Sequence, residues 1–256
     1  MTSAFMPTLC AAGESHCGCV RERNEDNFCY VSLYPGYLLA AVCDGVGGHA
    51  GGDVASYLCC HRLVLDWKKL FSENPTPPDA LMGCWLHDTL QRANLDIFAA
   101  NYEKEKKNQR PMCTTAAVAV FTPQMAIVAH VGDSRVYCLR NNICRQLTCD
   151  HTLQNELSEK GMCDSGRMPG AHIISRAVGS GPTMKVELHT YFRSAQDRYL
   201  ICSDGLSYCW SDAELGKVMQ SAKTPREATD LFIRDTLRRG AGDNVTAICV
   251  FPENIS

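Results

Sequence analysis

The stretch that decides the fold is Thr114–Leu139, TTAAVAVFTPQMAIVAHVGDSRVYCL. It contains three apolar runs, TTAAVAVF, MAIVAHV and SRVYCL, separated only by Thr-Pro and Gly-Asp. Runs of this length and composition are typical of β-strands, and the residues between them are typical of turns. We therefore expect three adjacent antiparallel strands in this part of the chain.

Strand and helix patterns continue on both sides of this segment. Further strands are expected over Asn27–Leu33, Tyr37–Cys43, Val186–Phe192, Arg198–Ser203 and Val245–Phe251, the first two joined as a hairpin through Pro35 and Gly36. Apolar residues at helical spacing predict helices over Asp53–Leu70, with Asp53 as the N-cap, and over Leu86–Ala100, Ser211–Ser221 and Pro225–Leu237. Long helices beside blocks of strands, without strict β-α-β alternation, predict an α+β fold built in layers.

Length and composition indicate one large globular domain. The chain has 256 residues, of which 45% are hydrophobic and 21% are charged, so it can bury a sizeable core. We find no linker, repeat or low-complexity segment, and we expect a single domain over residues 1–256. The less periodic stretch at about 150–175, with its glycines and proline, is typical of a mobile excursion.

The charge balance argues against two classes of partner. There are 25 Lys and Arg residues against 28 Asp and Glu, a formal net charge of −3, so no overall positive field exists to hold nucleic acid or an anionic membrane. No apolar run approaches the length of a transmembrane helix. We therefore expect no nucleic-acid or membrane partner, and any phosphate chemistry must use local groups.

The chain has 16 cysteines, a high number for its length. The start, Met1–Ser15, lacks the basic flank and apolar run of a secretion signal, and no Cys-x-x-Cys motif is present. We infer a reducing, cytoplasmic location. Cysteines inside apolar runs are expected to pack as small hydrophobic side chains, as at Cys43, Cys138, Cys202 and Cys249.

Six carboxylates stand at the edges of apolar strands: Glu25, Asp26, Asp44, Asp133, Asp204 and Asp243. Carboxylates that are brought together repel one another, so such a cluster is tolerable mainly when cations neutralise it. A set of oxygen ligands favours a hard ion, Mg²⁺ or Mn²⁺, over zinc or copper. Taken singly, each of these acids fits an ordinary turn, and the sequence alone does not show that they converge.

Other candidate sites are weaker. The segment Gly45–Ala50 fits the G-x-G-x-x-A dinucleotide fingerprint, but Asp44 would place a negative charge beside the pyrophosphate and no βαβ unit follows. A P-loop is excluded, since no Gly-Lys-Ser/Thr follows. Several histidines show no spacing typical of metal ligands and are expected in the core or at the surface: His16, His61, His87, His130, His172 and His189.

An ordered set of motifs carries a resemblance to a known family. It comprises Gly18-x-Val-Arg-x-x-Asn-Glu-Asp26, Asp44-Gly-x-Gly-Gly-His49, Thr114-Thr115, Val131-Gly-Asp-Ser-Arg135, Leu147-Thr-x-Asp-His151, Arg176-Ala-Val-Gly179, Ser203-Asp-Gly-Leu206 and Gly242-Asp-Asn-Val-Thr246. Their order and spacing, from about residue 12 to 251, resemble the metal-dependent type 2C serine/threonine protein phosphatases, in the compact form of the bacterial stand-alone enzymes.

The resemblance implies a four-layer αββα sandwich of two antiparallel sheets flanked by helices, with the acids in a cleft at one end. It implies two Mn²⁺ or Mg²⁺ ions, with a third, weaker site at Asp133. Asp44 would bridge the two ions, while Asp204 and Asp243 would hold one ion and Glu25 the other. The carbonyl of Gly45 would complete one site, and Asp26 would orient the metal-bound water.

The chemistry implied is hydrolysis of phosphoserine and phosphothreonine in proteins by a metal-activated water at the binuclear centre. Arg21, four residues before Glu25, matches the arginine that grips the substrate phosphate with a forked pair of donors. The expected partners are phosphoproteins made by a Ser/Thr kinase, and a monomer is expected.

The sequence departs from the family pattern beside Asp44, and two alternative functions remain open. Many eukaryotic members carry a histidine directly after Asp-Gly as general acid, whereas here Val46 takes that place and His49 follows three residues later, so the general acid is unassigned. The alternative functions are a pseudophosphatase that binds phosphoproteins without cleaving them, and a hydrolase acting on a non-protein phosphoester.

Overall fold

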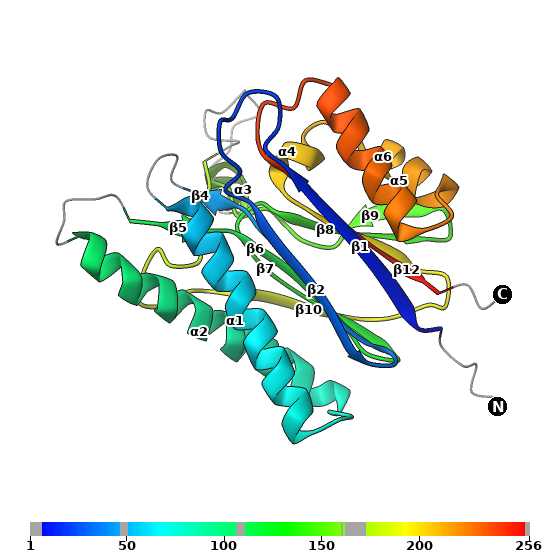
Figure 1. The fold of residues 1–256 in the computed structure, drawn as a ribbon, viewed down its shortest axis with the longest axis horizontal. Helices are drawn as coiled ribbons and strands as arrows, with labels where there is room; N and C mark the ends of the chain where they lie inside the picture. The colour runs from blue at the N-terminus through cyan, green and yellow to red at the C-terminus, as the bar shows by residue number, and fades with distance from the viewer. Residues whose placement is uncertain (1–6, 47–50, 106–110, 160, 162–172, 254–256) are drawn as a thin grey trace.

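Two five-stranded antiparallel sheets form the centre of the protein (Figure 1). The computed structural model describes residues 7–46, 51–105, 111–159, 161 and 173–253. One sheet has the order β1 (Leu9–His16), β12 (Val245–Pro252), β11 (Arg198–Cys202), β8 (Arg135–Arg140) and β9 (Ile143–Gln146). The other has the order β10 (Glu187–Phe192), β7 (Met125–Val131), β6 (Ala116–Phe121), β3 (Tyr37–Cys43) and β2 (Asn27–Tyr34). A short ribbon pairs β4 (Gly45–Val46) with β5 (Cys113–Thr114).

Helices cover the outer face of each sheet. The long helices α1 (Gly52–Glu73) and α2 (Asp79–Glu105) lie side by side on the sheet that contains β2 and β3 (Figure 1). On the opposite side of the molecule, α5 (Asp212–Ser221) and α6 (Pro225–Arg238) cover the sheet that contains β1 and β12. Two short helices, α3 (Leu153–Glu159) and α4 (Asp204–Ser207), follow strand ends. The four-layer αββα sandwich is therefore confirmed.

Three apolar layers explain why the strands are so hydrophobic. Leu38, Ala40 and Val42 on one face of β3 pack between the two sheets, while Leu39 and Ala41 on the other face pack beneath α1 and α2. Because side chains alternate along a strand, a strand between two packed layers must be apolar at every position. A third layer joins α5 and α6 to the other sheet through side chains such as Phe232.

Several sequence expectations need correction. The three runs in Thr114–Leu139 were expected to be neighbours, but only β6 and β7 pair, while β8 crosses into the other sheet and pairs with β9 and β11. The turn Gly132–Ser134 makes this crossing, with Gly132 at φ 101°. The N-cap of α1 is Gly51, not Asp53, because Asp53 lies within the first turn, where its carboxylate accepts the backbone N–H of Val54 at 2.9 Å.

The expectation for the buried cysteines is confirmed, whereas the expected flap and the segment with His49 lie partly outside the described residues. Cys43, Cys138, Cys202 and Cys249 are buried and free, as expected for packing thiols. No helix within the described ranges is long and apolar enough to cross a bilayer.

The expected flap at about 150–175 includes α3 and an antiparallel bridge between Thr152 and Ile174, while residues 160 and 162–172 lie outside the described chain. Residues 47–50, which include His49, also lie outside it.

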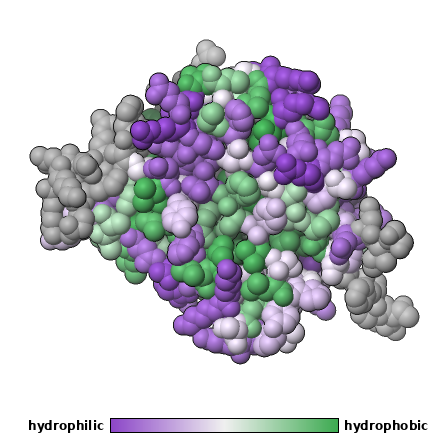
Figure 2. All heavy atoms as spheres, viewed as in Figure 1, coloured by the Kyte–Doolittle hydropathy of each residue, from purple (hydrophilic) through white to green (hydrophobic). Residues whose placement is uncertain are grey.

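The register brings the acidic strand ends to one end of the sandwich. Asn27 on β2 pairs with Cys43 on β3, so Asp26 and Asp44 adjoin. In the other sheet Cys202 on β11 pairs with Ala247 on β12, which places Asp204 near Asp243. Figure 2 shows mainly hydrophilic residues along the upper edge of the molecule, where Figure 1 places the loop between β1 and β2 together with α6.

Candidate active site

Asp26 links the two sheets at their acidic end. Its side chain is only 5% exposed. Its Oδ2 atom accepts hydrogen bonds from Ser203 Oγ at 2.8 Å, directly after β11, and from Thr246 Oγ1 at 2.6 Å, in β12. Its Oδ1 atom is buried and has no hydrogen-bond partner. One oxygen of Asp26 is therefore fixed in place while the other remains available.

Asp44 is held through its backbone, which leaves its carboxylate uncommitted to the fold. Its N–H donates to Thr115 Oγ1 at 3.0 Å, and its carbonyl accepts from the N–H of Thr115 at 2.8 Å. Thr114 Oγ1 donates to the same carbonyl at 2.8 Å. The Thr-Thr pair quoted in the sequence motif is thus the anchor that holds the end of β3, a role that the motif alone did not reveal.

Gly45 and Gly52 form a narrow cradle beside Glu25. A Cβ atom on Gly52 would lie 2.7 Å from Glu25 Oε2 and 2.9 Å from the carbonyl oxygen of Gly45. A Cβ atom on Gly45 would lie 2.4 Å from the backbone of Gly52. The absence of both side chains lets a carboxylate oxygen and a carbonyl oxygen face the same small space, and these are two of the predicted metal ligands.

Asp243 and Arg21 meet at the exposed rim of the site. Arg21 Nη2 donates to Asp243 Oδ2 at 2.8 Å, with the two side chains 50% and 42% exposed. The Asn244 side chain accepts from the N–H of Glu25 at 2.8 Å and donates to the carbonyls of Cys17 and Arg23. Asn244 therefore fastens the loop that carries both Arg21 and Glu25, another supporting role that the sequence did not reveal.

Burial, followed by repulsion between neighbouring carboxylates, raises the pKa values of several of these acids. Burial is the main reason why the pKa of Asp26 is raised to about 7. Hydrogen bonds from Thr246 and Ser203 lower this pKa, and repulsion from Asp204 raises it. Burial and then repulsion from Asp204 also raise the pKa of Asp133 to about 7. The pKa of Asp44 is raised well above its usual range by burial and then by Asp26.

Asp204 lies close to two other carboxylates of this end of the sandwich. Burial and then Asp243 raise its pKa, while its contact with the side chain of Asp44 lowers it.

The donor set fits divalent cations. The described residues contain six buried side-chain N or O atoms without a hydrogen-bond partner, and three of them are Asp26 Oδ1, Asp133 Oδ1 and Asp204 Oδ1. A buried acceptor without a donor is costly, so three at one place indicate a missing positive partner. All the candidate donors here are oxygens, which suits Mg²⁺ or Mn²⁺. The six carboxylates Glu25, Asp26, Asp44, Asp133, Asp204 and Asp243 are called the acidic centre below.

One further cluster was not foreseen. Among the described residues, the group of three potential metal ligands whose donor atoms all lie within 4.8 Å of one another is not in the acidic centre but consists of His130, His151 and Glu187. His130 had been expected to be a core or surface residue, and it is fully buried. Glu187 stands on an outer strand in no motif, so no sequence signal pointed to it.

Comparison with known proteins identifies the family to which this fold belongs. The family description "Protein phosphatase 2C" matches residues 12–246. The chain belongs to the protein phosphatase 2C family. The serine/threonine phosphatase stp of Listeria innocua is 33% identical over 236 residues, covering 91% of this chain and 92% of the relative.

Solved structures agree with this assignment. The Mycobacterium tuberculosis serine/threonine phosphatase PstP superposes with a TM-score of 0.81 at 30% identity, covering 96% of this chain and 100% of that one. The Streptococcus agalactiae serine/threonine phosphatase gives a TM-score of 0.85 at 26% identity, with the same coverage. A structure of the PstP catalytic domain holds two manganese ions and gives a TM-score of 0.79 at 30% identity, covering 96% and 99%. The present phosphatase is accordingly a metal-dependent hydrolase of the serine/threonine protein phosphatase class.

Proposed function

We propose that the acidic centre is the catalytic site at which this phosphatase hydrolyses phosphoserine and phosphothreonine in proteins. The observation that carries the proposal is the set of three unpartnered carboxylate oxygens, on Asp26, Asp133 and Asp204, at one end of the sandwich. A structural cluster would be satisfied by arginines or hydroxyls, as other buried carboxylates of this chain are. These oxygens are instead available to cations and substrate.

We expect these residues to form two metal sites and a third, weaker one. Glu25 and the carbonyl of Gly45 would hold one ion beside the Gly45–Gly52 cradle, Asp204 and Asp243 would hold another, and Asp44 would contact both. Asp133 would hold the third. When bound, such ions neutralise the carboxylates and lower the pKa of bound water, which supplies a nucleophile near neutral pH.

Asp26 and Arg21 act on the reacting groups. With Oδ2 held by Ser203 and Thr246, the Oδ1 atom of Asp26 remains available and would take a proton from the attacking water. Water attacks phosphorus as the bond to the seryl or threonyl oxygen breaks. Arg21, exposed at the rim, would turn part of its fork from Asp243 to the phosphoryl oxygens.

Several broader points belong to the same proposal. We expect Mn²⁺ or Mg²⁺ as the working ions and phosphoproteins made by a Ser/Thr kinase as substrates. We also expect one catalytic domain over residues 1–256, acting as a monomer in the cytoplasm, without nucleic-acid or membrane partners. Val46 leaves the general acid for the departing alcohol unassigned.

Metal dependence and substrate class test the proposal directly. The purified chain should hydrolyse p-nitrophenyl phosphate and a phosphothreonine peptide with Mn²⁺, and should lose both activities in excess EDTA. Turnover that persists in EDTA would overturn the metal role. Binding of the phosphopeptide without turnover would instead identify a pseudophosphatase, and preference for a nucleotide would identify another phosphoesterase.

A further inference from the structure

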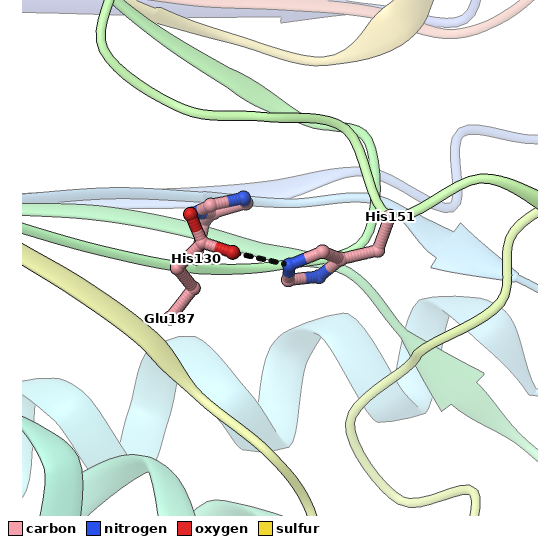
Figure 3. Close-up of side chains that lie close together, drawn as sticks. All are labelled: His130, His151 and Glu187. Carbon is pink, nitrogen blue, oxygen red and sulfur yellow. Dashed lines mark hydrogen bonds and ion pairs between the residues drawn. The ribbon is translucent and has the colours of Figure 1, made fainter. Parts of the chain in front are cut away.

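The cluster of His130, His151 and Glu187 lies beside the acidic centre and has no part in the mechanism above. His130 comes from β7, Glu187 from the start of β10, and His151 from the loop before α3. The register pairs Glu187 directly with His130 across the two strands. Figure 3 shows the three side chains converging, with the Glu187 carboxylate joined to the His151 ring.

The hydrogen-bond partners of the two ring nitrogens of His151, one from the backbone and one from Glu187, together determine where the ring proton lies. The N–H of Gly132 donates to His151 Nδ1 at 3.1 Å, so Nδ1 must present its lone pair and the ring proton must sit on Nε2. His151 Nε2–H then donates to Glu187 Oε2 at 3.2 Å. Burial, followed by the neighbouring His130, lowers the pKa of His151 to about 4, so the ring is neutral near pH 7.

This protonation state argues against a metal ion at the cluster. A histidine that binds a metal usually donates its second N–H to an acceptor, whereas His151 faces an N–H donor on that side. His130 Nε2 donates to the carbonyl of Cys149 at 2.7 Å, so only its Nδ1 lone pair remains. One imidazole nitrogen and one carboxylate are too few ligands for a closed protein site.

His151 instead holds the turn that carries Asp133 through two hydrogen bonds to the backbone of Gly132. Besides accepting the N–H of Gly132, it donates its own backbone N–H to the carbonyl of Gly132 at 2.9 Å. On the other side of the turn, a Cβ atom on Gly132 would lie 2.6 Å from Thr115 Cγ2. The peptide before Asp133 is therefore held between His151 and Thr115, with no space to shift.

The same turn connects onward to Asp44. Ser134 Oγ and Thr115 Oγ1 lie 2.7 Å apart in a hydrogen bond, and Thr115 Oγ1 accepts the N–H of Asp44. The His130 ring stacks on His151 with centroids 4.4 Å apart and planes 16° apart, which limits rotation of the His151 ring. A continuous chain of contacts thus runs from Glu187 through His151 to the backbone that carries Asp133 and Asp44.

We propose that Glu187 and His151 are positioning residues for the phosphatase reaction, in which Glu187 fixes the Nε2–H tautomer of His151 so that His151 holds the Gly132 peptide and aims Asp133 into the acidic centre. This inference rests on the proposed role of Asp133 as a metal ligand. Without the carboxylate, His151 gains access to the Nδ1–H tautomer, which would set two donors against each other at Gly132.

Three variants of the full-length protein separate this role from simple packing. Glu187→Leu keeps similar volume but removes the acceptor, and Glu187→Gln retains a carbonyl oxygen that can accept from Nε2–H. His189→Ala is the matched control, because His189 Nε2 contacts the other oxygen of Glu187 at 2.9 Å without touching His151. The Glu187 and His189 side chains are 31% and 46% exposed, so all three variants should fold.

The first readout is spectroscopic and independent of activity. Two-bond ¹⁵N–¹H spectra of the imidazole rings should show the Nε2–H tautomer for His151 in the wild type, in Glu187→Gln and in His189→Ala. Glu187→Leu should show a mixture of tautomers. An unchanged tautomer in Glu187→Leu would overturn the role given to Glu187.

The second readout is the Mn²⁺ requirement of turnover. In Glu187→Leu we expect the Mn²⁺ concentration for half-maximal rate to rise about tenfold, with kcat at saturating Mn²⁺ within about twofold of wild type. Glu187→Gln and His189→Ala should stay close to wild type. An equal Mn²⁺ requirement in Glu187→Leu and wild type would overturn the link to Asp133.

Two further outcomes are distinguishable from these. If the wild type shows no Mn²⁺-dependent turnover, the proposed function fails, while the tautomer spectra still test the contact between Glu187 and His151. If one equivalent of Zn²⁺ shifts the ring nitrogens of both His130 and His151, and Glu187→Leu abolishes that shift, the cluster is a metal site and the positioning role is overturned.

Discussion

Asp133 and Asp197 are equally buried, each 2% exposed, yet they lie in opposite electrostatic situations. They occupy opposite ends of the sandwich, next to the two ends of β8. Asp197 accepts from Arg140 at 2.8 and 2.6 Å, from the N–H of Ser194 at 2.7 Å and from the Tyr199 hydroxyl at 3.0 Å. Asp133 has a buried oxygen with no partner.

The difference separates a buried charge that the fold itself neutralises from one whose oxygen the fold leaves without a partner. A desolvated carboxylate is stable only when donors or cations surround it. At the end of the sandwich opposite the acidic centre, the guanidinium of Arg140 pairs with Asp197, so this carboxylate stabilises the fold there. At the acidic end the nearby guanidinium of Arg135 is paired with Asp150, and no Lys or Arg among the described residues forms an ion pair with Asp133. Asp133 is therefore the proposed partner of a metal ion. Each prediction below tests this contrast.

The largest effect is expected from Asp204→Asn. Loss of one negative ligand should lower kcat/KM by about 10³-fold or more, because the charge that holds the cation disappears. Steady-state kinetics with p-nitrophenyl phosphate at saturating Mn²⁺ would measure it. Asp212→Asn, at an exposed position in the first turn of α5, is the matched control and should retain wild-type turnover. Similar rates for the two variants would remove Asp204 from the site.

Asp133→Asn should change the pH dependence of stability in the metal-free protein. The folded-state pKa of about 7 exceeds the usual 3.8, so the native state binds the proton more tightly, and the stability this provides is lost as pH rises from about 4 through 7. Each unit of pKa shift corresponds to about 1.4 kcal/mol, so the effect amounts to a few kcal/mol. Thermal unfolding in EDTA from pH 5 to 8 should give a shallower decline for the variant and a higher Tm above pH 7. A steeper decline would contradict the raised pKa.

Asp197→Asn should show the opposite pattern. Replacing the carboxylate leaves Arg140 without its charged partner, which we expect to lower the free energy of unfolding by about 2 kcal/mol. Urea denaturation would measure the loss. The Mn²⁺ requirement of turnover should remain that of the wild type, and a raised requirement would show that the two ends of the sandwich are not independent.

The smallest effect is expected from Arg21→Lys. Lysine keeps the positive charge at the rim but cannot reproduce the forked pair of donors, so kcat/KM for a phosphopeptide should fall by about tenfold. The loss should be less than in Asp204→Asn, since Arg21 is half exposed. An unchanged kcat/KM would place the substrate phosphate elsewhere.

Strands and their acidic ends were largely predictable from the sequence. The runs ending before Asp44, Asp133 and Asp204 are strands, because apolar side chains at every position suit a strand buried on both faces. β1 was missed, because LCAAGESH has no clear alternation and its pairing with β12 spans almost the whole chain. The start of α2 at Asp79 was also missed, since the apolar spacing becomes regular only from Leu86.

Convergence of the site was beyond the sequence for a different reason. Asp26 contacts Ser203 and Thr246 across more than 170 residues, and no local pattern encodes such a contact. The family resemblance supplied the grouping of these acids that the strand patterns could not. Neither the strand patterns nor the family resemblance predicted the contact of Glu187 with His151. An acidic residue on a half-exposed strand looks in sequence like any acidic residue that faces solvent.

The pairing of β1 with β12 has a mechanical consequence. β1 is an edge strand, and its Leu9 lies opposite Pro252 while its His16 lies opposite Val245. A force that draws Leu9 and Pro252 apart would load the antiparallel hydrogen bonds one after another, as in a zipper, rather than all at once. The separation of β1 from β12 would begin far from the acidic centre and reach His16 and Val245 last. Under tension, the end of β1 and β12 that lies nearest the acidic centre is therefore the last to separate.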